Sequence, residues 1–362
     1  MPKRPGRRPA VVRSLAAIGC AALWIGGGAV ANAQVAPPSS VSLPADEAPH
    51  HNGVEWWYYT GHLTGVDTLG KQHAYGYEFT IFQVNLVDGV PATYSAHYAI
   101  TDLTRGSFNH EERVVVMPIP AETNGYSLPI TNWLMGGSQG SYVNSASFTD
   151  GSYSLSLKHQ APNPATLLYI NGIANAGAAN AIAYYSFPNM ATTGTIIDHG
   201  LRVTVTGTTE QDHQWVNLGS NPLANPIGAG WNWFGVMLNN NVQYNLSFIQ
   251  DSTGAITQVW ATEIKNGVGT LLPSSQVSLA SSGSWTSPIS GLSYPTQWQV
   301  KLPDGTFVIT PYVQGQEMNW PLHKSYYEGD SSVVGTWNGQ PITGKAYAEV
   351  SPIASQPVGV LP

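Results

Sequence analysis

Residues 51–63 read His51-Asn52-Gly53-Val54-Glu55-Trp56-Trp57-Tyr58-Tyr59-Thr60-Gly61-His62-Leu63. Four consecutive aromatic residues favour a β-strand, because flat rings pack well on a pleated surface and crowd the preceding turn of a helix. Alternate residues of a strand face opposite ways. One face therefore carries Glu55, Trp57 and Tyr59, and the other carries Trp56, Tyr58 and Thr60. A carboxyl group beside indole and phenol rings indicates either a lined pocket or a hydrogen-bonded core.

Short β-type runs continue along the chain, separated by Gly, Asn, Pro and Asp. The clearest runs are residues 74–84, 94–100, 153–157, 202–206, 242–249, 297–302 and 306–309. Asp-Gly pairs at 88–89, 150–151 and 304–305 lie between runs at hairpin spacing. No window has a sustained helical period, and residues 175–183 are rich in Ala but interrupted by Gly and Asn. The sequence predicts an all-β protein built of barrels or sandwiches.

The chain is longer than one ordinary β-barrel requires, so we predict two β-domains. The best boundary between them is the Asn- and Pro-rich segment 217–226. We expect an extended lead-in over residues 34–49, an N-terminal β-domain over 50–216 and a C-terminal β-domain over 227–352.

The N-terminus has the layout of a secretory signal peptide. Cations from Lys3 to Arg13 precede an apolar run from Leu15 to about Val30, and small residues up to Ala33 offer a cleavage site. A membrane anchor is disfavoured, because the apolar run is short and is interrupted by three Gly at 26–28. We therefore expect residues 1–33 to be removed and the protein to be exported to the periplasm or the extracellular space.

The cysteine content and the net charge limit the kinds of protein that this chain can be. Cys20, the only cysteine, lies in the expected signal peptide, so the mature protein must be stabilised by a sizeable core rather than by disulfides. Removal of five of the 14 cations leaves 9 against 21 acids, a formal net charge of about −12. Nucleic-acid binding is excluded as a class, because neutralising phosphates requires clustered cations.

The best acid–base candidates are Asp212 and His213 in the run Gln211-Asp212-His213-Gln214-Trp215. In a strand the two side chains face opposite ways, while His213 and Trp215 share a face. An apolar neighbourhood would raise the pKa of a carboxyl group and keep it protonated, as a proton donor requires. The alternative is a structural hydrogen-bonded Asp or His at a strand end.

Trp231 and Trp233 share one face of a second predicted strand, with Asn232 opposite. Two indoles on one face can line an apolar cavity or stack on a sugar, but ordinary core packing is the favoured explanation, because aromatic residues dominate protein cores. Four glutamates also lie in strand-like runs, and an inward pair of carboxylates would indicate glycoside hydrolysis; they are Glu55, Glu263, Glu328 and Glu349.

Other chemistries lack a sequence signature. The ten histidines are scattered without a His-x-x-x-His pair, so no metal site and no cofactor is expected. No Gly-x-Ser-x-Gly elbow is present, which argues against that type of serine hydrolase.

Residues 51–63 resemble the opening motif of the AttH/CrtC-like lipocalin-related family, which includes carotenoid 1,2-hydratases. The likeness continues in order through the chain. It includes 76–82 (GYEFTIF), 96–102 (AHYAITD), 183–190 (AYYSFPNM), 210–215 (EQDHQW), 230–234 (GWNWF), 294–298 (YPTQW), 327–329 (YEG) and 344–349 (GKAYAE).

The resemblance implies two lipocalin-like β-barrel domains that enclose an apolar small molecule, such as a terpenoid, a polyene or a lipid. Carried over by motif, Asp212 would protonate an isoprenoid-type double bond, and His213 would tune it or position water. Trp215 and Trp231 would shield the cation. The implied ligand-binding residues are Glu55, Trp57, Tyr59, His97, Trp215, Trp231 and Trp233.

Two rivals to this hydratase or lyase interpretation stay open. A non-catalytic carrier would bind the same hydrophobic ligand and leave it unchanged. A secreted carbohydrate-active protein would account for the abundant Trp and Tyr and the low charge. A carotenoid-type substrate would also place the protein in or near a membrane.

Overall fold

A computed structural model describes residues 38–51, 53–85, 89–175, 181–216, 229–319 and 325–353. These residues form two large antiparallel sheets and one two-stranded sheet, which confirms the all-β prediction. The expected signal peptide and the segment 217–226 lie outside the described residues. Within the described ranges, no helix combines the length and apolar character that crossing a membrane demands.

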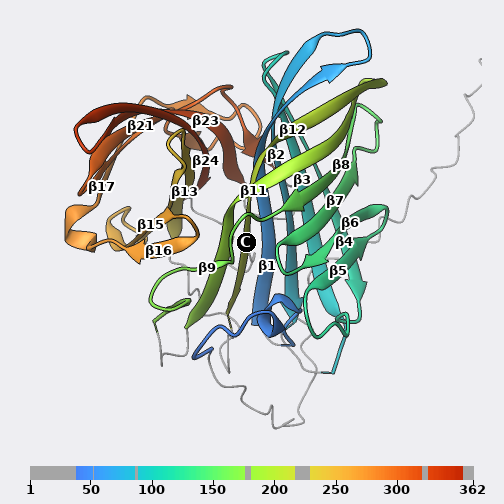
Figure 1. Cartoon of the computed structure of the whole chain (residues 1–362), viewed down its shortest axis with the longest axis horizontal. Coiled ribbons are helices and arrows are strands. Elements are labelled where there is room, and N and C mark those ends of the chain that lie inside the picture. Colours follow the sequence, from blue (N-terminus) through green and yellow to red (C-terminus); the bar gives the residue numbers. More distant parts are fainter. Residues whose placement is uncertain are drawn as a thin grey trace, which may run out of the picture. The chain divides into compact units, whose positions relative to one another are not determined.

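The first sheet has the strand order β4-β3-β2-β1-β12-β11-β8-β7-β6-β5 and runs from blue to yellow-green in Figure 1. The short 3₁₀ helix η1 (Ala45–Glu47) precedes it. Its strands are β1 (Gly53–Asp67), β2 (Gln72–Asn85), β3 (Ala92–Asp102), β4 (Ser107–Met117), β5 (Tyr126–Ile130), β6 (Trp133–Ser138), β7 (Ser141–Ser147), β8 (Tyr153–Gln160), β9 (Thr166–Leu167), β10 (Ile173–Ala174), β11 (Ile182–Asp198) and β12 (Leu201–Val216), with β9 and β10 paired to β11.

Side chains close this sheet where its two end strands, β4 and β5, contact each other. Arg113 of β4 donates one hydrogen bond to the Thr131 hydroxyl at 2.8 Å and another to the Ser147 carbonyl at 3.0 Å. Its guanidinium also lies 4.3 Å from the centre of the Trp133 ring, a cation–π arrangement. The sheet thereby becomes a nearly closed barrel.

The second sheet has the order β16-β15-β14-β13-β24-β23-β21-β20-β17 and runs from yellow to red in Figure 1. Its strands are β13 (Gly230–Leu238), β14 (Val242–Gln250), β15 (Ile256–Lys265), β16 (Val268–Leu271), β17 (Ser278–Ser282), β20 (Gln297–Leu302), β21 (Gly305–Pro311), β22 (Glu317–Met318), β23 (Tyr326–Trp337) and β24 (Gln340–Ser351). The 3₁₀ helix η2 (Ser274–Gln276) precedes β17, and β18 (Trp285–Thr286) pairs with β19 (Ser293–Tyr294). The two curled sheets are lipocalin-like barrels, as the resemblance implied.

Strands β1 and β12 pair along almost their whole length, and residues 57–63 of β1 and 209–216 of β12 are buried on both faces. One face lies in the apolar core of the first barrel, where Trp57 and Tyr59 are fully buried. The opposite face packs against the second barrel, because Tyr58 clusters there with Trp233 and Tyr347. The alternation predicted for residues 55–60 is therefore confirmed.

At one contact between the barrels a glycine leaves room for a side chain of the other barrel. Strand β2 contacts β23, and a Cβ atom built on Gly76 would meet Asp330, with the Asp330 Cβ 2.6 Å away. The Asp330 carboxylate lies 2.8 Å from His62 Nδ1, and this buried polar contact joins the two barrels. Gly76 thus fixes the distance at which this pair can form.

Replacing Gly76 by Ala should destabilise the protein by about 1–3 kcal/mol, the usual cost of overpacking. Urea unfolding of the Gly76→Ala variant measures this loss. All three atoms nearest to the added methyl group belong to Asp330, so the loss should be smaller when Gly76→Ala is introduced into an Asp330→Gly background. Equal losses in both backgrounds would contradict the steric explanation.

Candidate functional site

Asp212 lies on the face of β12 that packs against the second barrel. Its Oδ2 accepts a hydrogen bond of 2.7 Å from the Tyr184 hydroxyl of β11, whereas Oδ1 is buried without a hydrogen-bond partner in the described structure. Burial raises the pKa of Asp212 to about 7, although hydrogen bonds from Ser186 and Tyr184 partly oppose the shift. Near neutral pH this carboxyl group can therefore both donate and accept a proton.

Glu210 lies two residues before Asp212 on the same strand face. Burial raises its pKa well above the ordinary value, and the Asp212 charge raises it further. Glu210 also reaches the second barrel, since a Cβ atom added to Gly235 would collide with its Oε2 atom. Because the Asp212 charge as well as burial raises the pKa of Glu210, Asp212 is the member of this pair that we expect to lose its proton first.

A hydrogen-bonded chain connects Asp212 with the second barrel. Asn245 of β14 donates to the Tyr184 hydroxyl at 2.8 Å, and its side-chain oxygen accepts from Trp233 Nε1 at 3.3 Å. Trp233 in turn meets Tyr58 edge to face, with the ring centres 5.4 Å apart. The carboxyl group is therefore oriented by residues of both barrels and stands near an aromatic cluster, defined by Tyr58, Trp233, Tyr347, Trp56 and Trp231.

A second group of carboxyl side chains lies on the same contact between the barrels. Glu328 and Glu349 are directly opposite each other on β23 and β24. Tyr58 donates to Glu328 at 2.8 Å and Trp231 donates to Glu349 at 2.8 Å. Glu78 of β2 is fully buried, and neither of its carboxyl oxygens has a hydrogen-bond partner in the described structure. Burial, and then the neighbouring carboxylates, raise the pKa values of Glu78 and Glu328 well above normal.

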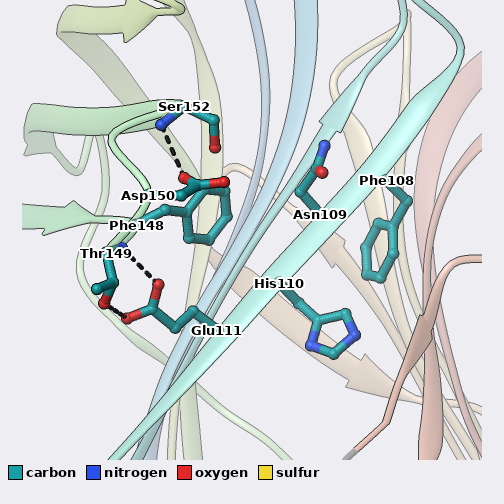
Figure 2. Close-up of a pocket in the computed structure, with 8 residues that line it drawn as sticks. All are labelled: Phe108, Asn109, His110, Glu111, Phe148, Thr149, Asp150 and Ser152. Carbon is teal, nitrogen blue, oxygen red and sulfur yellow. Dashed lines mark hydrogen bonds between the residues drawn. The ribbon is translucent and has the colours of Figure 1, made fainter.

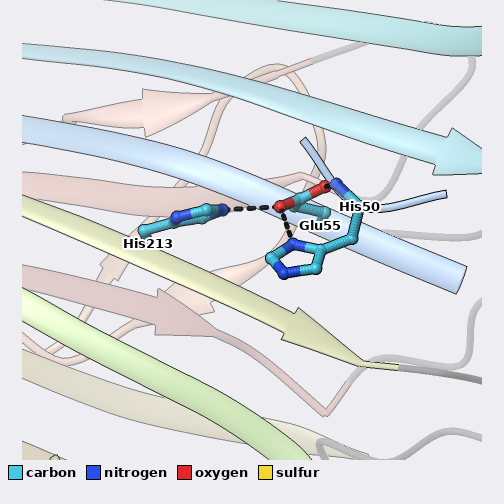
Figure 3. A group of neighbouring side chains, drawn as sticks. All are labelled: His50, Glu55 and His213. Atoms are coloured by element: carbon cyan, nitrogen blue, oxygen red, sulfur yellow. Dashed lines mark hydrogen bonds and ion pairs between the residues drawn. The ribbon is translucent and has the colours of Figure 1, made fainter. Parts of the chain in front are cut away.

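His213 points to the other face of β12, into the first barrel. Its Nε2 lies 2.6 Å from Glu55 Oε1, and its Nδ1 lies 3.0 Å from the Tyr185 hydroxyl. The same Glu55 oxygen lies 2.6 Å from His50 Nδ1. Figure 3 shows the two imidazoles converging on the Glu55 carboxylate.

Charge and aromatic contacts hold this interior group together. The two histidines lower the pKa of Glu55 despite its burial, and Glu55 with Asp46 raises the pKa of His50 to about 9, against the effect of its own burial. The Trp215 ring stacks on His50 at 4.3 Å, and the Trp57 ring stacks on His213 at 4.7 Å. Glu55 is therefore an ionised acceptor rather than a proton donor.

The residues expected to form one site are divided between the two faces of β1 and β12. Glu55, Trp57, Tyr59, His213 and Trp215 lie inside the first barrel. Asp212, Trp231 and Trp233 lie on the contact with the second barrel, as does His97, whose Nδ1 is 2.6 Å from the Tyr326 hydroxyl. Neither His213 nor Trp215 is on the same side as Asp212, so they cannot assist it directly.

Several residues near Asp212 and near Glu55 could not be identified from the sequence. Tyr184, Glu210 and Glu78 fall within the motifs at 183–190, 210–215 and 76–82, but nothing in their spacing marks them as partners. Nothing in the sequence groups His50 with His213 either, because the two residues are far apart in the chain. Only the antiparallel register of β1 and β12, which places Trp57 opposite His213 and Glu55 opposite Trp215, brings them together.

A pocket of about 530 Å³ lies on the first barrel, between β4 and the turn from β7 to β8 (Figure 2). Its acids hold the turn: Glu111 accepts from the Thr149 backbone at 2.6 Å, and Asp150 accepts from the Ser152 backbone at 2.8 Å. None of the sequence-predicted site residues belongs to its lining, which comprises Phe108, Asn109, His110, Glu111, Phe148, Thr149, Asp150 and Ser152.

Comparison with known proteins gives a consistent family assignment. The model of a family described as AttH-like matches residues 34–352. A crystal structure of a protein assigned as AttH from Nitrosomonas europaea has 25% sequence identity and a TM-score of 0.75, covering 89% of this chain and 100% of that one. No curated protein matches the sequence.

Two more distant structures share the fold. Kievitone hydratase from Nectria haematococca has 17% identity and a TM-score of 0.66, covering 88% of this chain and 98% of its own. CghA in complex with Sch210972 has 10% identity and a TM-score of 0.55, covering 88% and 96%. At these identities the likeness establishes the architecture.

The raised pKa of Glu78 predicts a pH-dependent effect of the Glu78→Gln substitution. The folded protein holds this proton more tightly than the unfolded chain, so folding loses stability as the pH rises above the ordinary Glu pKa of about 4.3. Gln stays neutral and avoids that loss. We expect the variant to melt about 2–4 °C above the unmodified protein at pH 8, and at the same temperature near pH 4.

Asp251→Asn is the matched control, because hydrogen bonds within its turn lower the Asp251 pKa. The effect of Asp251→Asn should have the opposite sign. Relative to the unmodified protein, this variant should be destabilised more at pH 8 than near pH 4. Thermal melts followed by circular dichroism measure both variants. A Glu78→Gln protein that is less stable at pH 8 than the unmodified chain would refute the protonated state of Glu78.

Proposed function

Because the chain belongs to the AttH-like family, we propose that it is an exported enzyme that adds water to, or removes it from, an isoprenoid-type double bond in an apolar small molecule. Asp212 is the proton donor in this proposal. The observation that carries it is the buried carboxyl oxygen Oδ1, which has no partner in the described structure while Tyr184 occupies Oδ2.

The hydrogen bonding of Asp212 selects the reactive oxygen. Tyr184 donates to Oδ2, so in the protonated acid the hydrogen is carried by Oδ1. Transfer of this proton to one alkene carbon uses the π electron pair to form a C–H bond and leaves a carbocation at the other carbon. Water then forms a C–O bond to the cation and returns a proton to the Asp212 carboxylate. The sum is one alkene and one water converted to one alcohol, with the acid regenerated.

The surroundings of Asp212 suit a cationic intermediate. Trp233 and Tyr58 offer aromatic surfaces near the acid, and a cation is attracted to the face of such rings. These two residues replace Trp215 in the shielding role, because Trp215 stacks on His50 inside the first barrel. Half-buried Trp56 and Trp231 continue the aromatic cluster toward solvent. A protein named as a hydratase, kievitone hydratase, has the same architecture, which supports the proposal.

Replacing Asp212 by Asn should lower turnover by about 10²–10⁴-fold, the range that general acid–base catalysis contributes, while ligand binding is retained. The mature protein is incubated with terpenoid and polyene alkenes in H₂¹⁸O, and mass spectrometry detects products that have gained labelled water. Native mass spectrometry measures binding by each variant, and Asp251→Asn, altered in an exposed turn, serves as the control with unchanged turnover.

Each outcome of this experiment separates the candidate functions. Full turnover by Asp212→Asn would remove Asp212 from the mechanism. If the unmodified protein and its variants bind the ligand tightly and none of them forms product, the protein is a carrier. Retention on a polysaccharide together with hydrolysis lost in Glu328→Gln and Glu349→Gln would favour carbohydrate chemistry, since these two acids are paired across β23 and β24.

Export is the second part of the proposal and rests on the cationic and apolar N-terminus. Expression of the full chain in a Gram-negative host should deliver protein to the periplasm with Gln34 as its first residue. N-terminal sequencing of the periplasmic fraction reads this directly. A cytoplasmic protein that retains residues 1–33 would contradict it.

A further inference from the structure

A separate group of side chains inside the first barrel has the composition of a metal site. We propose that His50, Glu55 and His213 bind one divalent transition-metal ion of the zinc class. This inference does not depend on the hydratase proposal, because the group lies on the opposite face of β12 from Asp212. Two imidazoles and one carboxylate are ligand types that zinc and related ions favour.

The three donor atoms converge on one point (Figure 3). Nδ1 of His50, Oε1 of Glu55 and Nε2 of His213 all lie within 4.8 Å of one another. The carboxylate oxygen is 2.6 Å from each of the two nitrogens. Around zinc, donor atoms at about 2.0–2.2 Å from the ion stand a little over 3 Å apart, so small side-chain shifts would open the position for an ion.

Each donor is already oriented by an outer partner, as metal ligands usually are. Tyr185 contacts Nδ1 of His213 at 3.0 Å, which leaves Nε2 for the ion. The second oxygen of Glu55 accepts from the His50 backbone at 2.8 Å and from Gln83 Nε2 at 3.2 Å, so Oε1 remains for coordination. Asp46 Oδ1 lies 3.6 Å from Nε2 of His50, the ring nitrogen that does not contact Glu55.

Burial and access also fit an ion site. Glu55 and His213 are almost fully buried, whereas 26% of the His50 side chain is exposed. An ion can therefore reach the group past His50, on the segment that leads into β1. Trp215 and Trp57, stacked on the two imidazoles, shield the other sides from water. Low solvent access strengthens the binding of a charged ion to charged ligands.

The test uses the mature protein stripped with a chelator and then titrated with ZnCl₂ or CoCl₂. We expect one equivalent of metal per chain by plasma mass spectrometry, and the visible absorption bands of Co²⁺ in a low-symmetry protein site. His50→Gln and Glu55→Gln should each weaken binding at least tenfold. Tyr185→Phe, which removes only an outer partner, should weaken it about 10–100-fold.

His73→Gln is the matched control, because His73 is also buried and paired with a carboxylate, Asp67, at 3.0 Å. It should bind metal like the unmodified protein. Circular dichroism confirms folding of each variant. If Glu55→Gln does not fold, His50→Gln and the Co²⁺ spectrum of the unmodified protein decide. Less than a tenth of an equivalent bound, or equal binding by His50→Gln, would overturn the proposal and leave a metal-free hydrogen-bonded cluster.

Discussion

The structure depends on one constraint: residues 57–63 of β1 and 209–216 of β12 are buried on both faces of their strands. One side of these strands forms the core of the first barrel and the other side packs on the second barrel. A strand in an ordinary barrel can place its polar residues in water on one side. Here every polar side chain of Glu210–Gln214 is buried. Each must find a partner within the protein or remain neutral.

This constraint explains why the two faces differ chemically. Inside the first barrel, two histidines lie beside Glu55 and keep it ionised. Between the barrels, Glu78, Glu210, Asp212 and Glu328 are desolvated mainly beside tyrosines, amides and other acids, and their pKa values rise. Carboxyl groups are therefore ionised on the face where histidines contact them, and they hold their proton more tightly on the opposite face.

The sequence predicts the fold better than the site. Aromatic runs and Asp-Gly turns locate β2, β8, β14 and β21, because these signals are local. Alternation also assigns Trp57 and Tyr58 to opposite faces. Which carboxyl group is neutral depends on contacts between residues far apart in the chain, such as Tyr58 with Glu328. Likewise, His50 and His213 become neighbours only through strand register, which no short motif encodes.

The hydrogen-bonded link from Asp212 through Tyr184 to Asn245 joins segments that are synthesised at different times. Asp212 is on β12, but Asn245 and Trp233, which complete its surroundings, are on β13 and β14 and are made later. Burial is the main cause of the raised pKa of Asp212, and in water an aspartate is fully ionised near neutral pH. We therefore expect this acid to reach its full proton affinity only after β13 and β14 have packed on its face, so that folding of the second barrel completes the site.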